Sequence, residues 1–397
     1  MREEQLKFIE EMNRKFGKNT LRPASDIKEE RAARIPSGSL SLDIALGGGI
    51  PLGRFIQISG AFSSTKSSLT YHIASNFQKY TKPLYERIQT KKKKQNDASS
   101  RDVFEYSPTT IEVPLTVALI QSEAEAWTNE YGTQIGIDVE NLIFNPTAGM
   151  EEALEIGHRM QEEGIADLII YDSLEAMVPM KEYDKDMNDG MQMGIKPKLF
   201  GEYFRKFQAT NNLLSREGAL PVTVIGINQL REKIGAYGDP EYTPGGRAIG
   251  FAASVDLRLK RRDWITIGSG VNKQIIGQQT AFKVHKNKTG TPQRTGSYDF
   301  YFDEGGPVPL GHIDVVKEIF IEGVAYGIIK RSGAWYEYED MRIQGGDPFL
   351  NQLRKEIDNS PDLFDELRDV ILDTALNSEE DVEDRFGEDD EEDWEDE

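Results

Sequence analysis

Residues 60–68 combine a glycine, small hydroxyl residues and a lysine in the order Gly-Ala-Phe-Ser-Ser-Thr-Lys-Ser-Ser. The apolar run RFIQIS (54–59) precedes them, and the helical pattern LTYHIASNFQKY follows. A strand, such a loop and a helix in this order predict a phosphate-binding loop, in which amides at the helix N-terminus hold phosphates, the lysine reaches the β- and γ-phosphates and a hydroxyl binds Mg²⁺. The predicted ATP-binding residues are Gly60, Ser63, Ser64, Thr65, Lys66, Ser67 and Ser68.

Thr65 departs from the usual loop, which has glycine before the lysine because glycine has a free φ and lets the backbone approach the phosphates. If Thr65 keeps the glycine-like backbone, it stores of order 1–3 kcal/mol of strain, and otherwise the loop has shifted. A turn with a purely structural role remains the alternative interpretation of the segment.

Three further apolar runs end in polar side chains that suit ATP hydrolysis. LIIYDS (168–173) delivers Asp172, which with Ser67 predicts a Mg²⁺ site. VALIQS (117–122) precedes Glu123 and Glu125, two candidates for the base that activates water, although each also fits a solvated loop charge. VTVIGIN (222–228) precedes Gln229, whose amide suits sensing of a γ-phosphate.

The loop after Gln229 begins with the basic residues Arg231 and Lys233 and is rich in glycine and proline as far as Gly246. Such a loop is compatible with binding of single-stranded nucleic acid, and equally with a structural hinge.

Continuous Val, Ile and Leu runs are typical of strands that are buried on both faces of a parallel sheet. We therefore expect an α/β core over residues 37–304. Residues 81–114 interrupt it with a polar insertion that contains four consecutive lysines, Lys91 to Lys94. The lysine run predicts a solvated surface loop, with a nucleic-acid contact as the alternative.

Smaller units flank this core. Residues 1–36 predict an amphipathic helix that ends at Gly17 and a polar linker; the helix docks on another subunit or packs on its own domain. Residues 305–376 predict a small α+β domain with a strand or hairpin in GAWYEYEDMRI and a helix that has Ser360 as N-cap and Pro361 as first residue.

Composition bounds the class of protein. The 397 residues are 38% hydrophobic and 29% charged, which is typical of a soluble globular chain, and no run of about 18 apolar residues predicts a membrane span. Cysteine is absent, which excludes disulfides and thiolate chemistry, and the four histidines are scattered, so we expect no transition metal.

The net charge of -21 is unevenly distributed along the chain. Fourteen acidic residues and one arginine in 379–397 contribute -13, which leaves -8 for the rest. We expect residues 377–397 to be a disordered acidic tail.

Several segments together resemble the bacterial RecA and phage UvsX class of homologous-recombination proteins. These are SGSLSLDIALGGGIPLGR (37–54), ADLIIYDSLEAMVP (166–179), INQLREKIG (227–235), the pair Gly245-Gly246, KVHKNK (283–288) and SGAWY (332–336). The resemblance runs in order from about Leu6 to Leu376. It implies a RecA-like P-loop ATPase core with a mostly parallel twisted sheet, an N-terminal helix arm and a small C-terminal α+β domain.

The resemblance also implies roles for individual residues. Lys66, Ser67 and Asp172 would bind ATP and Mg²⁺, and Glu123 would be the catalytic base, preferred to Glu125 because it ends the LIQSE segment. Tyr131 would stack on adenine, and Gln229 would couple the γ-phosphate to DNA binding. Lys286 and Lys288 would reach the ATP of a neighbouring subunit. The two DNA loops would cover 184–198 and 229–247, with contacts from Met193, Gly194, Lys198, Arg205, Arg231, Lys233, Ile234, Gly245, Gly246 and Arg247.

The sequence thus predicts an ATP-dependent DNA recombinase that forms a helical filament on single-stranded DNA and catalyses strand exchange. The alternatives are a RecA-like ATP- and DNA-binding protein with negligible hydrolysis, and a ring-forming ATPase that translocates along DNA. The expected partners are single- and double-stranded DNA, further copies of the chain, and single-strand-binding and mediator proteins. The expected location is the cytoplasm of a bacterium, or of the host if a phage encodes the chain.

Overall fold

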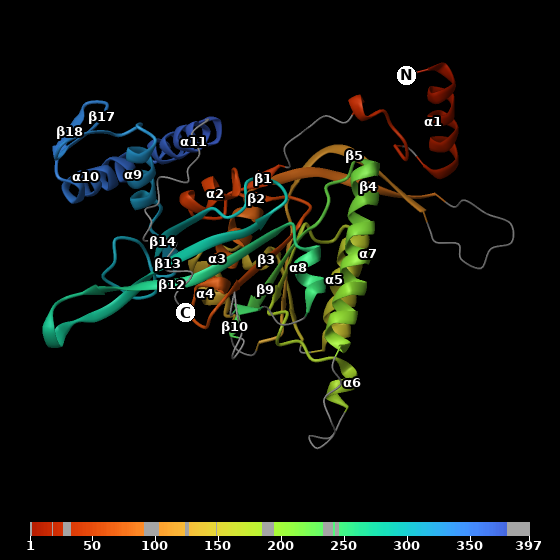
Figure 1. Cartoon of the computed structure of the whole chain (residues 1–397), viewed down its shortest axis with the longest axis horizontal. Coiled ribbons are helices and arrows are strands. Elements are labelled where there is room, and N and C mark those ends of the chain that lie inside the picture. The colour runs from red at the N-terminus through yellow and green to blue at the C-terminus, as the bar shows by residue number, and fades with distance from the viewer. Residues whose placement is uncertain are drawn as a thin grey trace.

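The computed structural model describes residues 2–17, 19–26, 33–90, 103–123, 127–147, 149–184, 194–232, 241–242 and 246–378. Within these residues the core is a nine-stranded sheet of order β15-β14-β13-β12-β3-β9-β8-β6-β7, parallel from β12 to β7 and antiparallel from β12 to β15 (Figure 1). Its strands are β3 (Phe55–Gly60), β6 (Val117–Gln121), β7 (Leu142–Pro146), β8 (Leu168–Asp172), β9 (Thr223–Gln229), β12 (Val255–Ile267), β13 (Gln274–Asn287), β14 (Thr295–Tyr301) and β15 (His312–Ile313).

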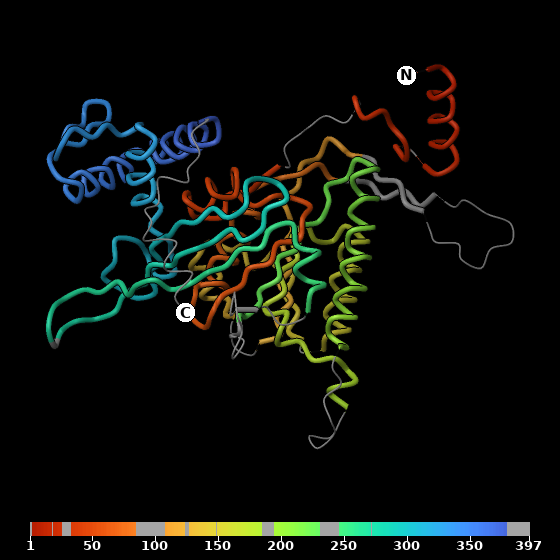
Figure 2. Tube along the Cα trace, in the orientation of Figure 1, coloured from red at the N-terminus to blue at the C-terminus, as the bar shows by residue number. Residues whose placement is uncertain are grey.

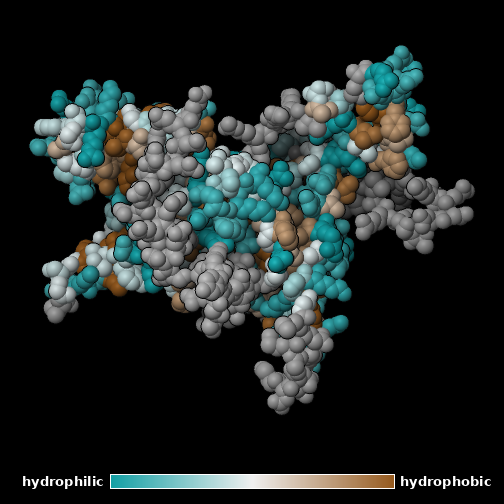
Figure 3. Space-filling view, in the orientation of Figure 1, coloured by the Kyte–Doolittle hydropathy of each residue, from teal (hydrophilic) through white to brown (hydrophobic). Residues whose placement is uncertain are grey.

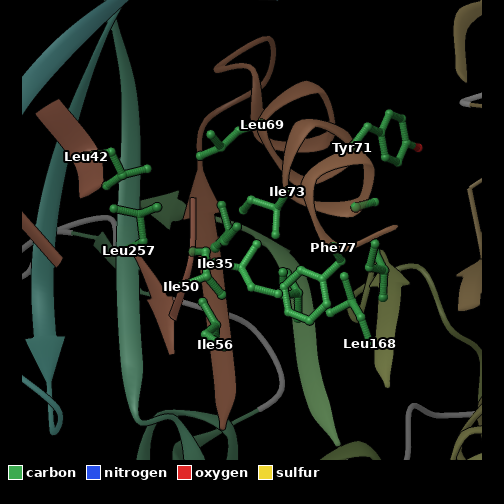
Figure 4. Packing of buried hydrophobic residues seen from close by; sticks show 14 of the residues in the cluster. Ile35, Leu42, Ile50, Ile56, Leu69, Tyr71, Ile73, Phe77, Leu168 and Leu257 are labelled. Carbon is green, nitrogen blue, oxygen red and sulfur yellow. The ribbon is translucent and has the colours of Figure 1, made fainter. Parts of the chain in front are cut away.

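The four apolar runs identified in the sequence form β3, β6, β8 and β9, which confirms the predicted parallel sheet. Each is almost entirely buried because helices cover both faces. Helix α3 (Lys66–Gln78) packs on one face, where Ile73 and Phe77 point toward the sheet beside Ile56 (Figure 4). The helices on the other face are α5 (Met150–Glu162), α7 (Ile195–Glu217) and α8 (Arg247–Ala252).

Shorter elements connect these layers. They are β1 (Arg34–Ile35), α2 (Leu40–Leu46), β2 (Ile50–Pro51), α4 (Asn129–Gln134), α6 (Met180–Tyr183), β10 (Arg231–Glu232) and β11 (Glu241–Tyr242), with single turns of 3-10 helix at Ala24–Asp26, Val139–Asn141 and Gly270–Asn272. In the part of the chain described above, no helix has the length and apolar composition needed to cross a membrane.

The N-terminal helix α1 (Glu3–Phe16) ends at Gly17 as predicted, and the amide of Gly17 donates to the carbonyl of Asn13. None of its residues is buried, although Phe8 and Phe16 are large and apolar. Figure 3 shows brown, apolar patches on the surface of α1, and Figure 2 shows α1 and the C-terminal helices at opposite ends of the molecule. The helix therefore has an apolar face that its own domain leaves uncovered.

The polar insertion at 81–114 contains strands that the sequence did not indicate. Its two arms are not loop but strands β4 (Thr81–Thr90) and β5 (Val103–Pro114), which pair as an antiparallel hairpin that projects from the core (Figure 1). Aromatic and β-branched residues recur in both arms between the polar ones, and such residues favour strands. Lys91 to Lys94 lie outside the described residues.

The C-terminal region is an α+β unit, as predicted. It contains α9 (Val315–Ala325), β16 (Lys330–Ser332), β17 (Trp335–Tyr338), β18 (Met341–Gln344), α10 (Gly346–Asn359) and α11 (Asp362–Asn377). The central sheet continues to Ile313, past the expected domain boundary at 304. The predicted helix cap is wrong by one residue, because Ser360 is the C-cap of α10 and Pro361 is the N-cap of α11. The expected acidic tail lies almost wholly outside the described residues.

Candidate nucleotide-binding and DNA-binding site

Strand β3 leads through residues 61–65 into α3, the order predicted for a phosphate-binding loop. Gly60 pairs with Leu259 of β12 on one side and with Gln229 of β9 on the other. A Cβ atom on Gly60 would lie 2.3 Å from the carbonyl oxygen of Leu259 and 2.5 Å from Oγ of Ser64. No side chain fits there, so only glycine lets the loop pack this closely against the sheet.

Thr65 keeps a left-handed backbone, with φ 59° and ψ 18°. A β-branched residue is strained in this region, so the glycine-like loop persists at an energetic cost. The Thr65 hydroxyl lies 2.8 Å from the Tyr298 hydroxyl and 3.2 Å from Oγ1 of Thr280, on β14 and β13. These hydrogen bonds anchor the loop to the sheet and offset part of the strain.

Lys66 is the first residue of α3, and its ammonium group donates to the carbonyl of Ala61 at 2.6 Å. The side chain therefore curls over the loop, where a phosphate group would accept the same protons. Burial lowers the pKa of Lys66, while the carboxylates of Glu123 and Asp172 act in the opposite direction. These two carboxylates thus favour the charged lysine that phosphate binding requires.

Asp172 ends β8 and is buried, with 1% of its surface exposed. Burial raises the pKa of Asp172, whereas hydroxyl groups of Ser67 and Tyr71 that donate to its carboxylate lower it. The Tyr71 contact measures 2.9 Å. Sequence reasoning missed Tyr71, although its spacing of four from Ser67 places both on one face of α3.

The oxygen ligands of Ser67 and Asp172 suit Mg²⁺, which binds proteins through one or two such groups and completes its shell with phosphates and water. Within the described residues no cluster of three or more His, Cys, Asp or Glu side chains could hold a metal ion. The residues at the loop therefore fit a nucleotide-bound magnesium ion rather than a site built from protein ligands alone.

Glu123 follows β6 and is half-buried. Its Oε1 atom accepts hydrogen bonds from the Ser173 hydroxyl at 2.5 Å and from Nε2 of Gln229 at 3.5 Å. The sheet order explains the contact, because β6 and β9 flank β8 and all three strands end at the same edge. Sequence reasoning missed Ser173, whose position directly after Asp172 could have indicated it. Glu125 lies outside the described residues.

Tyr131 lies on α4, and its hydroxyl donates to Oγ of Ser68 at 3.1 Å. Its ring forms an edge contact with the ring of Tyr71, at 6.2 Å between centroids. A Cβ atom on Gly311 would lie 3.1 Å from the Tyr131 ring. The predicted adenine-stacking residue is thus held beside the first turn of α3.

Lys286 and Lys288 lie on one side of the chain, as their spacing predicts. Their ammonium groups donate to the carbonyls of Gly250 at 2.6 Å and Phe251 at 3.3 Å, in the last turn of α8. Cations suit this end of a helix because its carbonyl groups are unpaired and point outward.

A β-bulge sets the direction of these lysines. Leu257 pairs with Val284, but the preceding residue, Asp256, pairs with Lys286, so His285 is an extra residue in β13. Val284 packs in the core on the α3 face, and strict alternation would point Lys286 to the same face. The extra residue turns Lys286 to the α8 face instead.

The described C-terminal ends of the two segments predicted to bind DNA meet where α7 and α8 begin. Gly194 is the N-cap of α7, and Lys198 and Arg205 are exposed seven residues apart on one face of that helix. Gly246 is the N-cap of α8, and a Cβ atom there would lie 2.9 Å from Cγ of Pro197.

The remaining predicted DNA residues are only partly described. Arg247 is exposed at the start of α8, and the backbone of Arg231 pairs with Tyr242. Met193, Lys233, Ile234 and Gly245 lie outside the described residues.

Comparison with known proteins decides the family. The family model of the RecA N-terminal domain matches residues 4–84 and 112–306, and that of the RecA C-terminal domain matches 317–376. Protein RecA of Rubrobacter xylanophilus is 33% identical over 375 residues, which cover 94% of this chain and 93% of the relative. Protein RecA of Acidothermus cellulolyticus is 34% identical over 366 residues, 91% of this chain and 90% of the relative. The chain belongs to the RecA family.

RecA-family membership makes the chain a DNA-dependent ATPase of the P-loop class that acts in DNA recombination and repair. It also sets the β4–β5 hairpin apart. The RecA N-terminal model stops at residue 84 and resumes at 112, so most of the hairpin is an addition to the family fold. The nucleotide loop, the four strand ends and Lys286 all lie within the matched part.

Proposed function

We propose that the chain forms a helical filament on single-stranded DNA and catalyses strand exchange, with ATP bound at the loop between β3 and α3. Lys66 would hold the phosphates, and Ser67 and Asp172 would hold Mg²⁺, which neutralises phosphate charge when it is bound. Family membership favours this recombinase over a non-hydrolysing binding protein or a ring translocase. The acidic tail and mediator proteins would regulate access to the DNA.

Glu123 would act as the base that takes a proton from the attacking water. The observation that carries this assignment is the shared position of Glu123, Asp172 and Gln229 at the ends of three adjacent parallel strands. Gln229 is also the first residue of the second predicted DNA loop, so movement of its amide would link the γ-phosphate to DNA. Tyr131 would contact adenine.

Lys286 and Lys288 would complete the site of the neighbouring subunit, as arginine fingers do in other P-loop enzymes. Cross-subunit catalysis requires a head-to-tail interface, and such an interface gives an open helix when its rotation does not close. The uncovered apolar face of α1 is suited to the same assembly.

A hydrolysis assay on single-stranded DNA tests this assignment with Glu123→Gln. Hydrolysis should fall by about a hundredfold or more, whereas ATP-dependent DNA binding should remain. Glu130→Gln is the matched control, because Glu130 is an exposed glutamate on the neighbouring helix α4. Parent-level hydrolysis by Glu123→Gln would remove Glu123 from the mechanism, and a joint-molecule assay with homologous duplex tests strand exchange itself.

A further inference from the structure

Beneath α8 lies a buried carboxylate to which the mechanism above assigns no role. Asp256, near the start of β12, exposes 8% of its surface. Its neighbours in the sheet are Gln57 of β3 and Lys286 of β13. Among the described residues its Oδ1 atom has no hydrogen-bond partner. A buried carboxylate is costly unless an opposite charge faces it, so a cation beside Asp256 is needed to compensate for its burial.

Lys286 is placed to supply that charge. The bulge at His285 makes Lys286 the cross-strand partner of Asp256, and both side chains project from the α8 face of the sheet. Without the extra residue, Lys286 would share the face of Val284 and lie across the sheet from Asp256. The bulge therefore places Asp256 and Lys286 opposite each other on the same face of the sheet.

The charges around Lys286 are few. Asp256 on β12 attracts its ammonium group, and Lys288, just beyond β13, repels it. Burial raises the pKa of Asp256, and the charges of Arg258, on the same strand, and then of Lys286 lower it. Helix α8 contributes the carbonyl of Gly250, while its only charged residue, Arg247, is at the opposite end. Asp256 is thus the carboxylate that offsets the repulsion between the two lysines.

We propose that Asp256 is a positioning residue, which keeps Lys286 protonated and held at the end of α8 until a neighbouring subunit presents its nucleotide. This inference rests on the proposed role of Lys286 in cross-subunit catalysis. It adds a residue behind the lysine that does not itself touch the substrate.

The direction of the pH effect follows from the charges. Burial and Lys288 lower the pKa of Lys286, and Asp256 raises it. Lys286 acts in its protonated form, so its contribution is present below its pKa and is lost as pH rises through it. Removing the Asp256 charge lowers that pKa further, and the loss then begins at a lower pH.

The first experiment measures the lysine directly, in the full-length protein without DNA. Lysine side chains labelled with ¹³C at Cε are titrated by NMR, and the Lys286 signal is assigned by its absence in Lys286→Arg. Asp256→Asn should shift the Lys286 titration to lower pH. An unmoved titration midpoint would overturn the inference whatever the lysine does in catalysis.

The second experiment measures ATP hydrolysis on single-stranded DNA from neutral to alkaline pH. The alkaline limb of the pH profile is the range in which the rate falls as Lys286 loses its proton. In Asp256→Asn this limb should lie at lower pH. At a pH above the Lys286 pKa of both proteins, the variant's rate should be about tenfold lower for each unit by which that pKa falls. Asp256→Glu should restore much of the parent profile. In the Lys286→Arg background, where the guanidinium stays charged, Asp256→Asn should no longer move the limb.

A matched control separates positioning from stability. Asp299 is a buried carboxylate on β14 that pairs with Lys317, so Asp299→Asn should lower the melting temperature and leave the alkaline limb in place. If Asp299→Asn shifted the alkaline limb as much as Asp256→Asn does, the effect of Asp256 would be a general effect on stability and not the positioning of Lys286. If Lys286→Ala keeps full DNA stimulation, the cross-subunit role is wrong, while the NMR titration still decides whether Asp256 sets the pKa of Lys286.

Discussion

Nε2 of Gln229 donates to Oε1 of Glu123 at 3.5 Å, across the end of strand β8. The two residues are 106 positions apart in the sequence. Glu123 is the proposed base and Gln229 is the first residue of the second predicted DNA loop, so this hydrogen bond is a direct contact between the two. Ser173, directly after β8, donates a hydrogen bond to the same carboxylate oxygen.

Replacement of Gln229 tests this contact. Gln229→Ala should leave ATP binding intact and reduce the stimulation of hydrolysis by DNA, because the link between loop and base is lost. Gln229→Glu places a second carboxylate beside Glu123 and raises the pKa of the pair, so its rate should be lowest at low pH and recover as pH rises. If the hydrolysis rates of Gln229→Glu and of the parent protein keep the same ratio at every pH, the contact does not influence the base.

Lys66→Ala should lower the rate of ATP hydrolysis by about a hundredfold or more and abolish strand exchange, while the fold stays intact. Among the described residues, the Lys66 ammonium group donates hydrogen bonds only to a loop carbonyl and a serine hydroxyl, so little stability depends on it. Circular dichroism and ATP turnover measure the two effects. Turnover at the parent rate would refute the phosphate-binding loop.

Lys286→Ala and Lys288→Ala should each retain DNA-independent ATP binding and lose DNA-stimulated hydrolysis. The reason is that both ammonium groups lie at the end of α8, where they are available to a neighbour's nucleotide. Mixing Lys286→Ala with Glu123→Gln should restore part of the activity. At some subunit contacts the first variant then supplies Glu123 and the second supplies Lys286. Absence of any such complementation would contradict catalysis between subunits.

Thr65→Gly should relieve about 1–3 kcal/mol of backbone strain and lose the hydrogen bonds to Tyr298 and Thr280. Because the loop is then less firmly anchored, ATP affinity or turnover should change measurably. Tyr298→Phe separates the two effects, since it removes one partner and leaves φ of Thr65 untouched. Identical kinetics of Thr65→Gly and the parent would show that threonine is only tolerated here.

A chain that ends at Asn377 should bind duplex DNA more tightly and need less free Mg²⁺ for strand exchange. The removed segment carries -13 and should compete with phosphates for basic residues such as the exposed Lys198 and Arg205. Mg²⁺ screens the tail in the full-length protein. Magnesium titrations of strand exchange should therefore separate the two chains, and superimposable curves would exclude autoinhibition.

Much of this architecture was predictable because it depends on local patterns. The runs that became β3, β6, β8 and β9 are continuously apolar, and strands buried on both faces require that pattern. The loop from Gly60 to Lys66 has a local signature because a phosphate must meet amides, a lysine and a hydroxyl within one turn. The hairpin β4–β5 was missed because a lysine run and many polar residues hide its strand-forming residues.

Only the tertiary structure decided which of these residues meet. Glu123 contacts Gln229 because the sheet places β8 between β6 and β9, an order that differs from the order along the chain. Lys286 faces Asp256 because one extra residue, His285, reverses the alternation of β13. Local preferences determine where a strand forms and ends, whereas sheet order and a bulge depend on how all strands share one core. The sequence therefore determined the identity of the chemical groups, and the packing of the sheet determined their partners.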